Sequence, residues 1–388
     1  MKTTRSTARS AALIRSHSAL AIARAGAIFG VSIALALPAA ATSFTVVNLV
    51  TDDQSANAAQ ITDPNLKNAW GISYSPTSPF WVSSNEVGLA VLYRVDPLSN
   101  ATTKQGLEVT IPGAGNVTGQ VFNPASAGNF NGDLFLFVSE DGTISGWKGS
   151  LGTNAEVLQV GSTTNSYKGA AIAVIGSDAY LYAADFAGNQ VDIRKGNAAA
   201  PDLTGSFTDP GIPAGYAPFN VQNLGGTLYV TYALRDPVTG DDVAGPGNGF
   251  VSAFDLQGNF LGRVGSDGTL NSPWGLARAP ASFGAFAGDL LVGNFGDGRI
   301  NVFDTTTDTF IGQLLGAGGI PLTIDGLWGL IPGNDGGAGN SHSIYFSAGP
   351  GDEQHGLFGV LAVPEPTTAA LLGLAMMILG VARRRTSA

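Results

Sequence analysis

The sequence predicts an all-β fold, a six-bladed β-propeller with four-stranded blades, and three observations support this prediction. First, the chain of 388 residues contains 54 glycines and 20 prolines without a collagen-like period, which is typical of β proteins with many turns. Second, a short unit recurs six times at intervals of 49 to 55 residues. Third, each unit contains short β-branched and aromatic runs separated by Gly, Asn and Asp, which is the pattern of strands joined by turns.

Each unit begins with a related tripeptide, which is Trp-Gly-aliphatic in three of the six copies. In chain order the tripeptides start at Trp70, Gly119, Ala170, Phe219, Trp274 and Trp328. Four strands at this period are typical of a propeller blade, and we expect the tripeptide on the innermost strand. There a large ring can fill the gap between blades and glycine permits close approach of two backbones. We therefore interpret the tryptophans as packing residues rather than ligand-stacking residues.

The two ends of the repeated region are complementary. The sixth unit stops at Val363 without a fourth strand, whereas a surplus strand, residues 43–50, precedes the first unit. We expect this strand to complete the last blade, because it would then close the ring and cover a sheet edge that could otherwise pair with other chains. Residues 42–363 are therefore predicted to form one propeller.

The first 41 residues are interpreted as a signal peptide. Five basic residues and no acidic residue precede an apolar run from Ala25 to Leu37, and the small residues that follow place cleavage near Ala41. The apolar run is shorter than the ~20 residues that span a bilayer. A signal peptide is therefore favoured over the alternative of a membrane-anchoring first helix.

Residues 364–388 form a second targeting segment. It begins with Pro364, Glu365 and Pro366, continues as an apolar stretch from 369 to 382, and ends with Arg383, Arg384 and Arg385. This order resembles the PEP-CTERM sorting signal of Gram-negative bacteria. The resemblance implies an exosortase as processing partner, transient anchoring in the inner membrane through a C-terminal hydrophobic helix, and a final place at the cell surface or outside the cell. An ordinary C-terminal anchor is the alternative.

The charge of the predicted propeller limits its partners. Residues 42–363 contain 11 basic and 28 acidic residues, which gives a net charge of −17. Such a body has no basic face for nucleic acid and favours cations or neutral glycans over polyanions. The chain contains no cysteine, which excludes disulfides and thiol chemistry.

Acidic and amide residues recur where the second and third strands of each unit are joined, and these turns open on the same face as the starts of the first strands. The candidate residues for a binding rim around the channel on this face are Asn68, Glu86, Glu140, Asp185, Asn220, Asp297 and Asp325. The fourth unit carries a long excursion there, residues 235–249, and its candidate metal ligands are Asp236, Asp241 and Asp242. Carboxylates in this arrangement suit Ca²⁺ or a polyol. The alternative is ordinary turn chemistry, because Asp, Asn and Gly favour tight turns.

The fifth unit, residues 272–304, resembles an NHL repeat, and the whole body resembles an uncharacterised family of exported bacterial six-bladed propellers. The second resemblance rests on the segments 48–53 and 62–73 and on the final Gly-Leu-Trp-Gly-Leu. It implies the fold and the compartment and no activity. Six-bladed propellers of the gluconolactonase type imply one further possibility, a divalent cation held at the channel mouth, for which Asn220 and Asp325 are suitable residue types. That family's first-blade glutamate has no counterpart here, because Lys67 and Asn68 precede Trp70.

The sequence contains few residues that could form other catalytic arrangements. Behind the predicted signal peptide the only histidines are His342 and His355, and no Gly-x-Ser-x-Gly nucleophile elbow surrounds a serine beside them. We therefore predict a non-catalytic binding or interaction module for exopolysaccharide or surface proteins. The alternative is a metal-dependent hydrolase of the gluconolactonase type.

Overall fold

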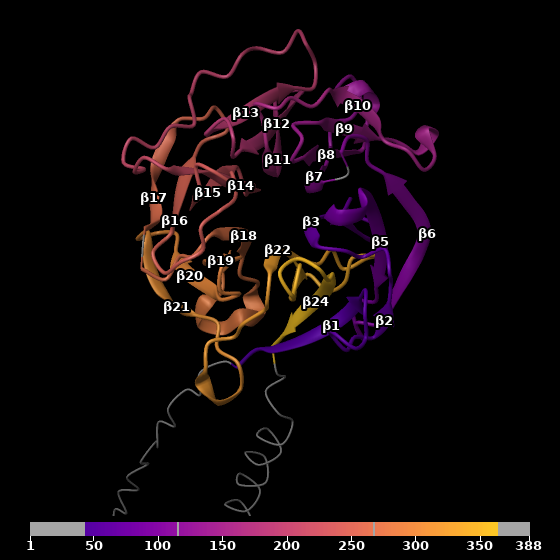
Figure 1. Ribbon diagram of the computed structural model, residues 1–388, viewed down its shortest axis with the longest axis vertical. Coiled ribbons are helices and arrows are strands. Elements are labelled where there is room, and N and C mark those ends of the chain that lie inside the picture. The colour runs from indigo at the N-terminus through magenta and orange to yellow at the C-terminus, as the bar shows by residue number, and fades with distance from the viewer. Residues whose placement is uncertain (1–42, 115, 267, 364–388) are drawn as a thin grey trace, which may run out of the picture. The chain divides into compact units, whose positions relative to one another are not determined.

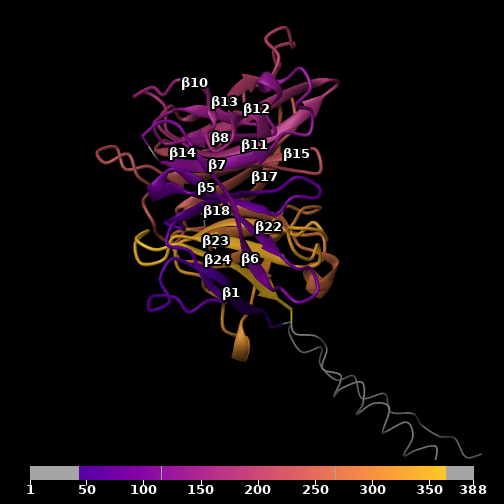
Figure 2. The same cartoon turned by 90° about the vertical axis from the view of Figure 1, so that its right-hand side faces the viewer.

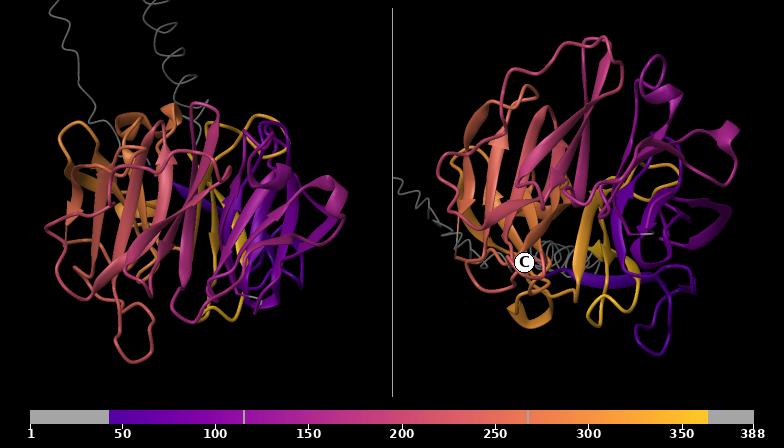
Figure 3. Two further views of the ribbon diagram at one scale, coloured as in Figure 1. Left: turned by 90° about the horizontal axis from the view of Figure 1, so that it is seen from above. Right: turned by 45° about the horizontal axis from the view of Figure 1, so that its top comes forward.

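The computed structural model describes residues 43–114, 116–266 and 268–363, and these residues form a six-bladed β-propeller (Figure 1). The predicted signal peptide and C-terminal helix lie outside the described residues. Within the described part of the chain, no helix is long and apolar enough to cross a bilayer. The strands run through the thickness of the ring and the loops gather on its two faces (Figure 3). The predicted fold class is confirmed.

In every blade the first strand is the innermost. Blades 1 and 2 consist of β3 (Ala69–Ser73), β4 (Phe80–Ser84), β5 (Leu89–Val95) and β6 (Thr102–Thr110), and of β7 (Val117–Phe122), β8 (Phe135–Ser139), β9 (Ile144–Trp147) and β10 (Glu156–Gln159). Blades 3 and 4 consist of β11 (Tyr167–Ile175), β12 (Asp178–Asp185) and β13 (Gln190–Lys195), and of β14 (Tyr216–Leu224), β15 (Thr227–Leu234), β16 (Gly249–Phe254) and β17 (Phe260–Ser266). Blade 5 consists of β18 (Pro273–Arg278), β19 (Leu290–Asn294), β20 (Ile300–Asp304) and β21 (Thr309–Gln313).

Blade 6 combines both ends of the described chain. It consists of β22 (Leu327–Pro332), β23 (Ile344–Ala348), β24 (Leu357–Ala362), β1 (Thr45–Thr51) and the short edge strand β2 (Ile61–Thr62). The loops contain the short 3-10 helices η1 (Asn85–Val87), η2 (Phe130–Gly132), η3 (Gly149–Leu151), η4 (Ala281–Phe286) and η5 (Ala317–Gly319).

The position of a strand in its blade explains its sequence pattern. Second strands such as β4, β8, β19 and β23 are buried along their whole length, because a neighbouring blade covers each face of the sheet. They therefore read as continuous apolar runs rather than as alternating patterns. The outermost strands β10 and β21 are largely exposed or half-buried and correspondingly more polar. Inner strands contact one another in a circle that ends with β22 against β3.

The N-terminal strand closes the ring as predicted. β1 pairs antiparallel with β24, from Thr45 opposite Ala362 to Thr51 opposite Leu357. The indigo β1 lies beside the yellow β24 in two perpendicular views (Figures 1 and 2). The edge of β24 is therefore covered by the opening strand of the same chain.

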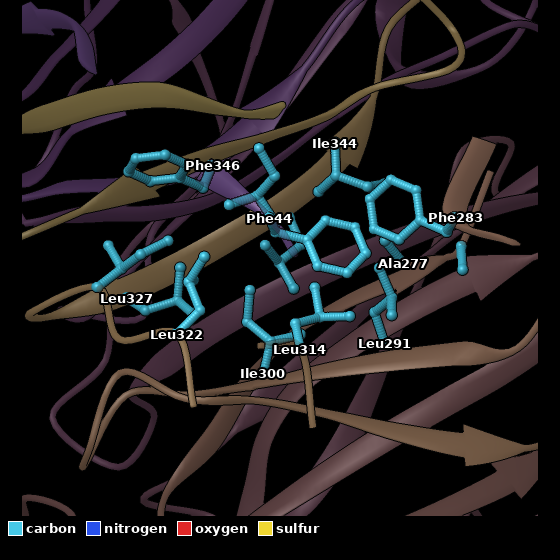
Figure 4. Packing of buried hydrophobic residues seen from close by; sticks show 14 of the residues in the cluster. Phe44, Ala277, Phe283, Leu291, Ile300, Leu314, Leu322, Leu327, Ile344 and Phe346 are labelled. Carbon is cyan, nitrogen blue, oxygen red and sulfur yellow. The ribbon is translucent and has the colours of Figure 1, made fainter. Parts of the chain in front are cut away.

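Residues just before β1 extend this closure into blade 5. Phe44 is 1% exposed, and its ring centroid lies 4.8 Å from that of Phe283. Around it, apolar side chains of blades 5 and 6 form one cluster (Figure 4). The backbone N–H of Phe44 donates to the carbonyl oxygen of Leu315 at 2.7 Å. The opening segment thus fastens blade 6 to blade 5 as well as completing blade 6.

The third blade departs from the four-stranded pattern, because its described sheet contains only β11, β12 and β13. The chain that follows crosses to blade 4 instead. The N–H groups of Gly205 and Phe207 donate to the carbonyl oxygens of Gln257 and Gly258 at 2.8 and 3.0 Å. Phe207 also packs against Phe254 with ring centroids 5.4 Å apart. The segment therefore links the outer parts of two blades.

The glycines of the repeated tripeptide allow neighbouring inner strands to approach closely. A Cβ atom placed on Gly71 would lie 2.5 Å from the carbonyl oxygen of Thr118, on the next blade. Cβ atoms on Gly119 and Gly275 would meet the adjacent inner strands at 2.5 and 2.6 Å. Such distances leave no room for a side chain. The predicted reason for these glycines is confirmed.

Candidate functional site

The turns between second and third strands gather on one face of the ring, together with the starts of the inner strands. This follows from the alternating strand directions, and the turns include η1 in blade 1 and the excursion 235–248 in blade 4. We call this face the upper face. It contains two features, a polar cluster at the axis and an open cavity beside it.

Aromatic rings close the axis beneath the upper face. Trp70 and Trp328 stack with centroids 3.6 Å apart, and Trp274 meets both edge-on at 6.1 and 5.8 Å. Phe295 stacks on the other side of Trp328 at 3.9 Å. The three tryptophans are 1 to 5% exposed. Their interpretation as packing residues agrees with this burial, but they pack against one another across the axis rather than between blades.

The axial channel below these rings is nearly filled. The cavity between the inner strands measures about 20 Å³ and is lined by residues such as Gln120, Asn220 and Gln222. A volume of this size holds about one water molecule. Any ligand larger than a few atoms must therefore bind on a face rather than along the axis.

A chain of polar side chains lies directly over the tryptophans. The amide of Asn68 donates to the carboxylate of Glu353, and its oxygen accepts from the indole Nε1 of Trp328 at 3.0 Å. Asn85 donates to Glu140 at 3.3 Å, and Glu140 in turn accepts from the ammonium of Lys168. These residues come from blades 6, 1, 2 and 3. We call the residues Asn68, Asn85, Glu140, Lys168, Asp242 and Glu353 the axial cluster.

The axial cluster has more negative than positive charges. Lys168 is its one cation, and its ammonium lies 5.4 Å from the ring centroid of Trp70. It donates to Glu140 and opposes the rise in the pKa of both Asp242 and Glu353. Burial raises the pKa of Glu353, and the nearby carboxylate of Glu140 raises it further, although the Asn68 hydrogen bond and Lys168 oppose the rise. Burial likewise raises the pKa of Asp242. Both carboxyl groups therefore hold a proton more readily than exposed ones do.

These shifts predict a specific pH dependence for Glu353→Gln. A carboxyl group whose folded pKa is raised binds more protons in the folded than in the unfolded chain. The wild type therefore loses stability as pH rises from the ordinary value of 4.5 through the folded pKa. The amide variant lacks this loss and can still accept from Asn68. We expect it to be more stable than the wild type at pH 7, with a flatter profile of unfolding free energy from pH 4 to 8.

Asp209→Asn is the control with the opposite sign. Burial raises the pKa of Asp209, but hydrogen bonds from Arg263, Ser252 and Gly211 more than offset this and hold it below its usual value. The wild-type carboxylate therefore stabilises the fold above pH 3.8, and the variant should lose stability at pH 7. Urea unfolding at each pH measures both variants. A Glu353→Gln profile parallel to the wild type would contradict the raised pKa.

The second feature of the upper face is an open cavity of about 760 Å³. It lies between the ends of blades 2 and 3 and the excursion of blade 4. Hydroxyl and amide side chains are prominent in its wall, and these are Thr143, Ser162, Thr163, Asn165, Ser166 and Thr239. Glu140 and Lys168 of the axial cluster also line it. The cavity and the cluster therefore share a wall.

The structure separates the predicted rim residues into two groups. Asn68 and Glu140 belong to the axial cluster. The other five lie outside the axial cluster, and they are Glu86, Asp185, Asn220, Asp297 and Asp325. Asp185 accepts from backbone N–H groups of Ser166 and Gly188, and Asp325 accepts from that of Gly351. A rim role for this second group stays a prediction.

The three acids of the blade 4 excursion have different surroundings. Asp236 accepts from the backbone N–H groups of Val238 and Thr239 at 2.7 and 3.1 Å, which is turn chemistry. Asp241 is exposed at the cavity, whereas Asp242 belongs to the axial cluster. In the described part of the chain no three His, Asp or Glu side chains are arranged to hold a metal ion. Binding of Ca²⁺ by this excursion stays a prediction.

Sequence reasoning missed two basic residues of the upper face, Lys168 and Arg235. Lys168 lies at the start of β11, just before the repeated tripeptide that begins at Ala170. Arg235 immediately follows β15. A signal was available, because the propeller contains only 11 basic residues. His355 has a structural role, since its Nδ1 lies 3.0 Å from the buried carboxylate of Asp52.

The fold and the C-terminal residues together define the class of protein. Residues 362–385 match the PEP-CTERM protein-sorting motif. The motif contains the predicted residues from Pro364 to Arg385 and implies export, membrane-associated sorting and processing by an exosortase. The protein is thus an exported six-bladed propeller with a PEP-CTERM tail.

The chain belongs to the same family as two proteins of Acanthamoeba polyphaga mimivirus. It is 33% identical over 337 residues to "Uncharacterized protein L690", which covers 81% of this chain and 85% of that relative. It is also 33% identical over 322 residues to "Uncharacterized protein R648", covering 78% of this chain and 76% of that relative. Alignments of this length include most of the propeller. The NHL-like character of the repeats stays a prediction.

The solved structures that align with the chain are much more distant in sequence. The chain aligns with "Streptogramin B lyase structure" at 13% identity and a TM-score of 0.44, covering 82% of this chain and 97% of that chain. It aligns with "glucose dehydrogenase" at 13% identity and a TM-score of 0.47, covering 82% and 99%. Likeness at this level carries no information about activity.

Proposed function

We propose that this exported propeller is a non-catalytic binding module that takes extracellular polysaccharide in the cavity of the upper face. The observation that carries the proposal is the 760 Å³ cavity, whose wall combines five hydroxyl side chains and one amide with apolar surface. Its volume is in the range of small-ligand sites, and such groups match the many hydroxyls of a sugar. The closed ring holds the three contributing blades in a fixed arrangement, so the site is largely formed before a ligand arrives.

The alternative of a metal-dependent lactone hydrolase has less support. Asn220, which such a site would use, is 2% exposed and donates its amide to the carbonyl oxygen of Trp274 at 2.8 Å. It lies in the filled channel rather than at an open mouth.

A glycan array with the full chain purified in detergent tests the proposal. We expect Thr163→Trp, which places a bulky ring in the cavity, to abolish binding. Leu98→Trp is the control, because Leu98 is 93% exposed in a turn of the opposite face. Binding that survives Thr163→Trp would reject the cavity as the site. Turnover of a lactone, abolished by a chelator, would favour the enzyme, and binding only to surface proteins would reject the sugar ligand.

A further inference from the structure

Arg235 differs from the other partly buried basic residues of the described chain. Those residues all donate from their charged groups to a carboxylate or carbonyl oxygen, and they are Lys67, Lys148, Lys168, Arg194, Lys195 and Arg263. The structure gives the guanidinium of Arg235 neither a hydrogen bond nor an ion pair, and its Nε is buried without a partner. The terminal Nη groups also lack a partner but are not buried, so they remain free to donate to a ligand in the cavity.

The backbone around Arg235 is held firmly, so its side chain begins from a fixed position. Its own N–H donates to the carbonyl oxygen of Gly215 at 2.8 Å, and it forms a β-bridge with Asp242. The turn that follows returns through Gly240, whose φ of 84° favours glycine and whose Cβ would lie 3.3 Å from Nη2 of Arg235. The guanidinium therefore lies against this turn, in the wall of the cavity.

The three acids that line the cavity beside Arg235 form no ion pair with it. Glu140 is paired with Lys168. Asp141 accepts from the backbone N–H groups of Ala114 and Thr143 at 2.9 and 3.0 Å. Asp241 is exposed to solvent, which screens it. The cavity thus contains one cation without a partner in a propeller whose net charge is strongly negative.

We propose that Arg235 binds the carboxylate of a uronic acid residue in the polysaccharide. This inference rests on the proposed function and names the ligand class. A guanidinium presents paired N–H donors that match a carboxylate, while the hydroxyl and amide wall of the cavity contacts the sugar hydroxyls. The negative body disfavours densely charged polymers, so the matching ligand carries an isolated uronic acid among neutral sugars.

Titration calorimetry on the full chain in detergent tests this proposal with two matched sugars. The probes are a trisaccharide ending in glucuronic acid and the same trisaccharide with its carboxyl group reduced to an alcohol. We expect the wild type to prefer the acid by about 10- to 100-fold, the effect of one charge-assisted hydrogen-bonded pair. Arg235→Gln should lose this preference and bind the neutral sugar as the wild type does. Arg278→Gln, an exposed arginine outside the cavity, is the control.

The outcomes separate the two proposals. Equal affinity of the wild type for both sugars, or a preference that survives Arg235→Gln, would overturn the role of Arg235 but leave sugar binding intact. Binding of neither sugar, together with an empty glycan array, would overturn the proposed function itself. Tighter binding of an acidic peptide at Arg235 would overturn the proposal that the ligand is a uronic acid. If Arg235→Gln unfolds, Arg235→Lys keeps the charge without the paired donors and should lose most of the preference.

Discussion

Deletion of residues 43–50 is expected to destabilise the propeller by more than about 5 kcal/mol, which is comparable with the whole stability of many domains. The deletion removes most of β1 and with it the pairing along β24. It also removes Phe44, and loss of a buried phenylalanine side chain alone costs about 3–5 kcal/mol. The exposed edge of β24, which is rich in Leu, Val and Phe, would then be free to pair with other chains.

We expect the protein that lacks residues 43–50 to aggregate under conditions in which the intact chain remains monodisperse. Size-exclusion chromatography and urea unfolding measure the two effects. Phe44→Ala separates the packing contribution from strand pairing and should cost about 3–5 kcal/mol. Phe310→Ala is the matched control, because Phe310 is 46% exposed and should cost about 1 kcal/mol or less. A deleted protein as stable as the intact chain would show that β1 does not close the ring.

The second large effect is expected for Trp328→Ala, which should lower the free energy of unfolding by about 3–5 kcal/mol. Trp328 lies between Trp70 and Phe295, and stacks on both. Its removal opens a void at the point where the inner strands of several blades meet. It also removes the indole donor to Asn68, so the amide oxygen of Asn68 loses that partner inside the buried cluster.

Trp328→Phe distinguishes these contributions. It keeps an aromatic ring but loses the indole N–H, and we expect a cost of about 1–3 kcal/mol from the unpaired oxygen of Asn68. Urea unfolding followed by circular dichroism suits the comparison, because it does not depend on tryptophan fluorescence. If Trp328→Ala remained within about 1 kcal/mol of the wild type, the axial aromatic packing would not stabilise the ring.

The architecture was predictable because it depends on features that repeat along the chain. The spacing from Trp70 to Trp328 indicated six units, and the missing strand after Val363 indicated the closing role of residues 43–50. Steric limits made the glycines at 71, 119 and 275 predictable as well, since their role depends on one neighbouring strand. The missing fourth strand of blade 3 was not predictable, because it depends on where the loop before β14 finds its hydrogen-bond partners.

The site was much less predictable, because it is built from residues that are far apart in sequence. Asn68 and Glu353 are separated by 285 positions yet share a hydrogen bond. Turn chemistry and site chemistry also use the same residue types, so Asp236 and Glu140 looked equivalent in the sequence. Arg235 is distinguished only by the lack of a partner in three dimensions. Repetition predicts strands well, whereas the site depends on loops that differ from blade to blade.

Hydrogen exchange measured by mass spectrometry is the most direct test of ring closure by the opening strand. If β1 belongs to blade 6, those amides of residues 45–51 that donate to β24 should exchange as slowly as the amides of residues 344–348 in β23, since both would open only when the blade opens. Exchange of residues 45–51 at the rate of an unstructured peptide, while residues 344–348 remain protected, would contradict the account.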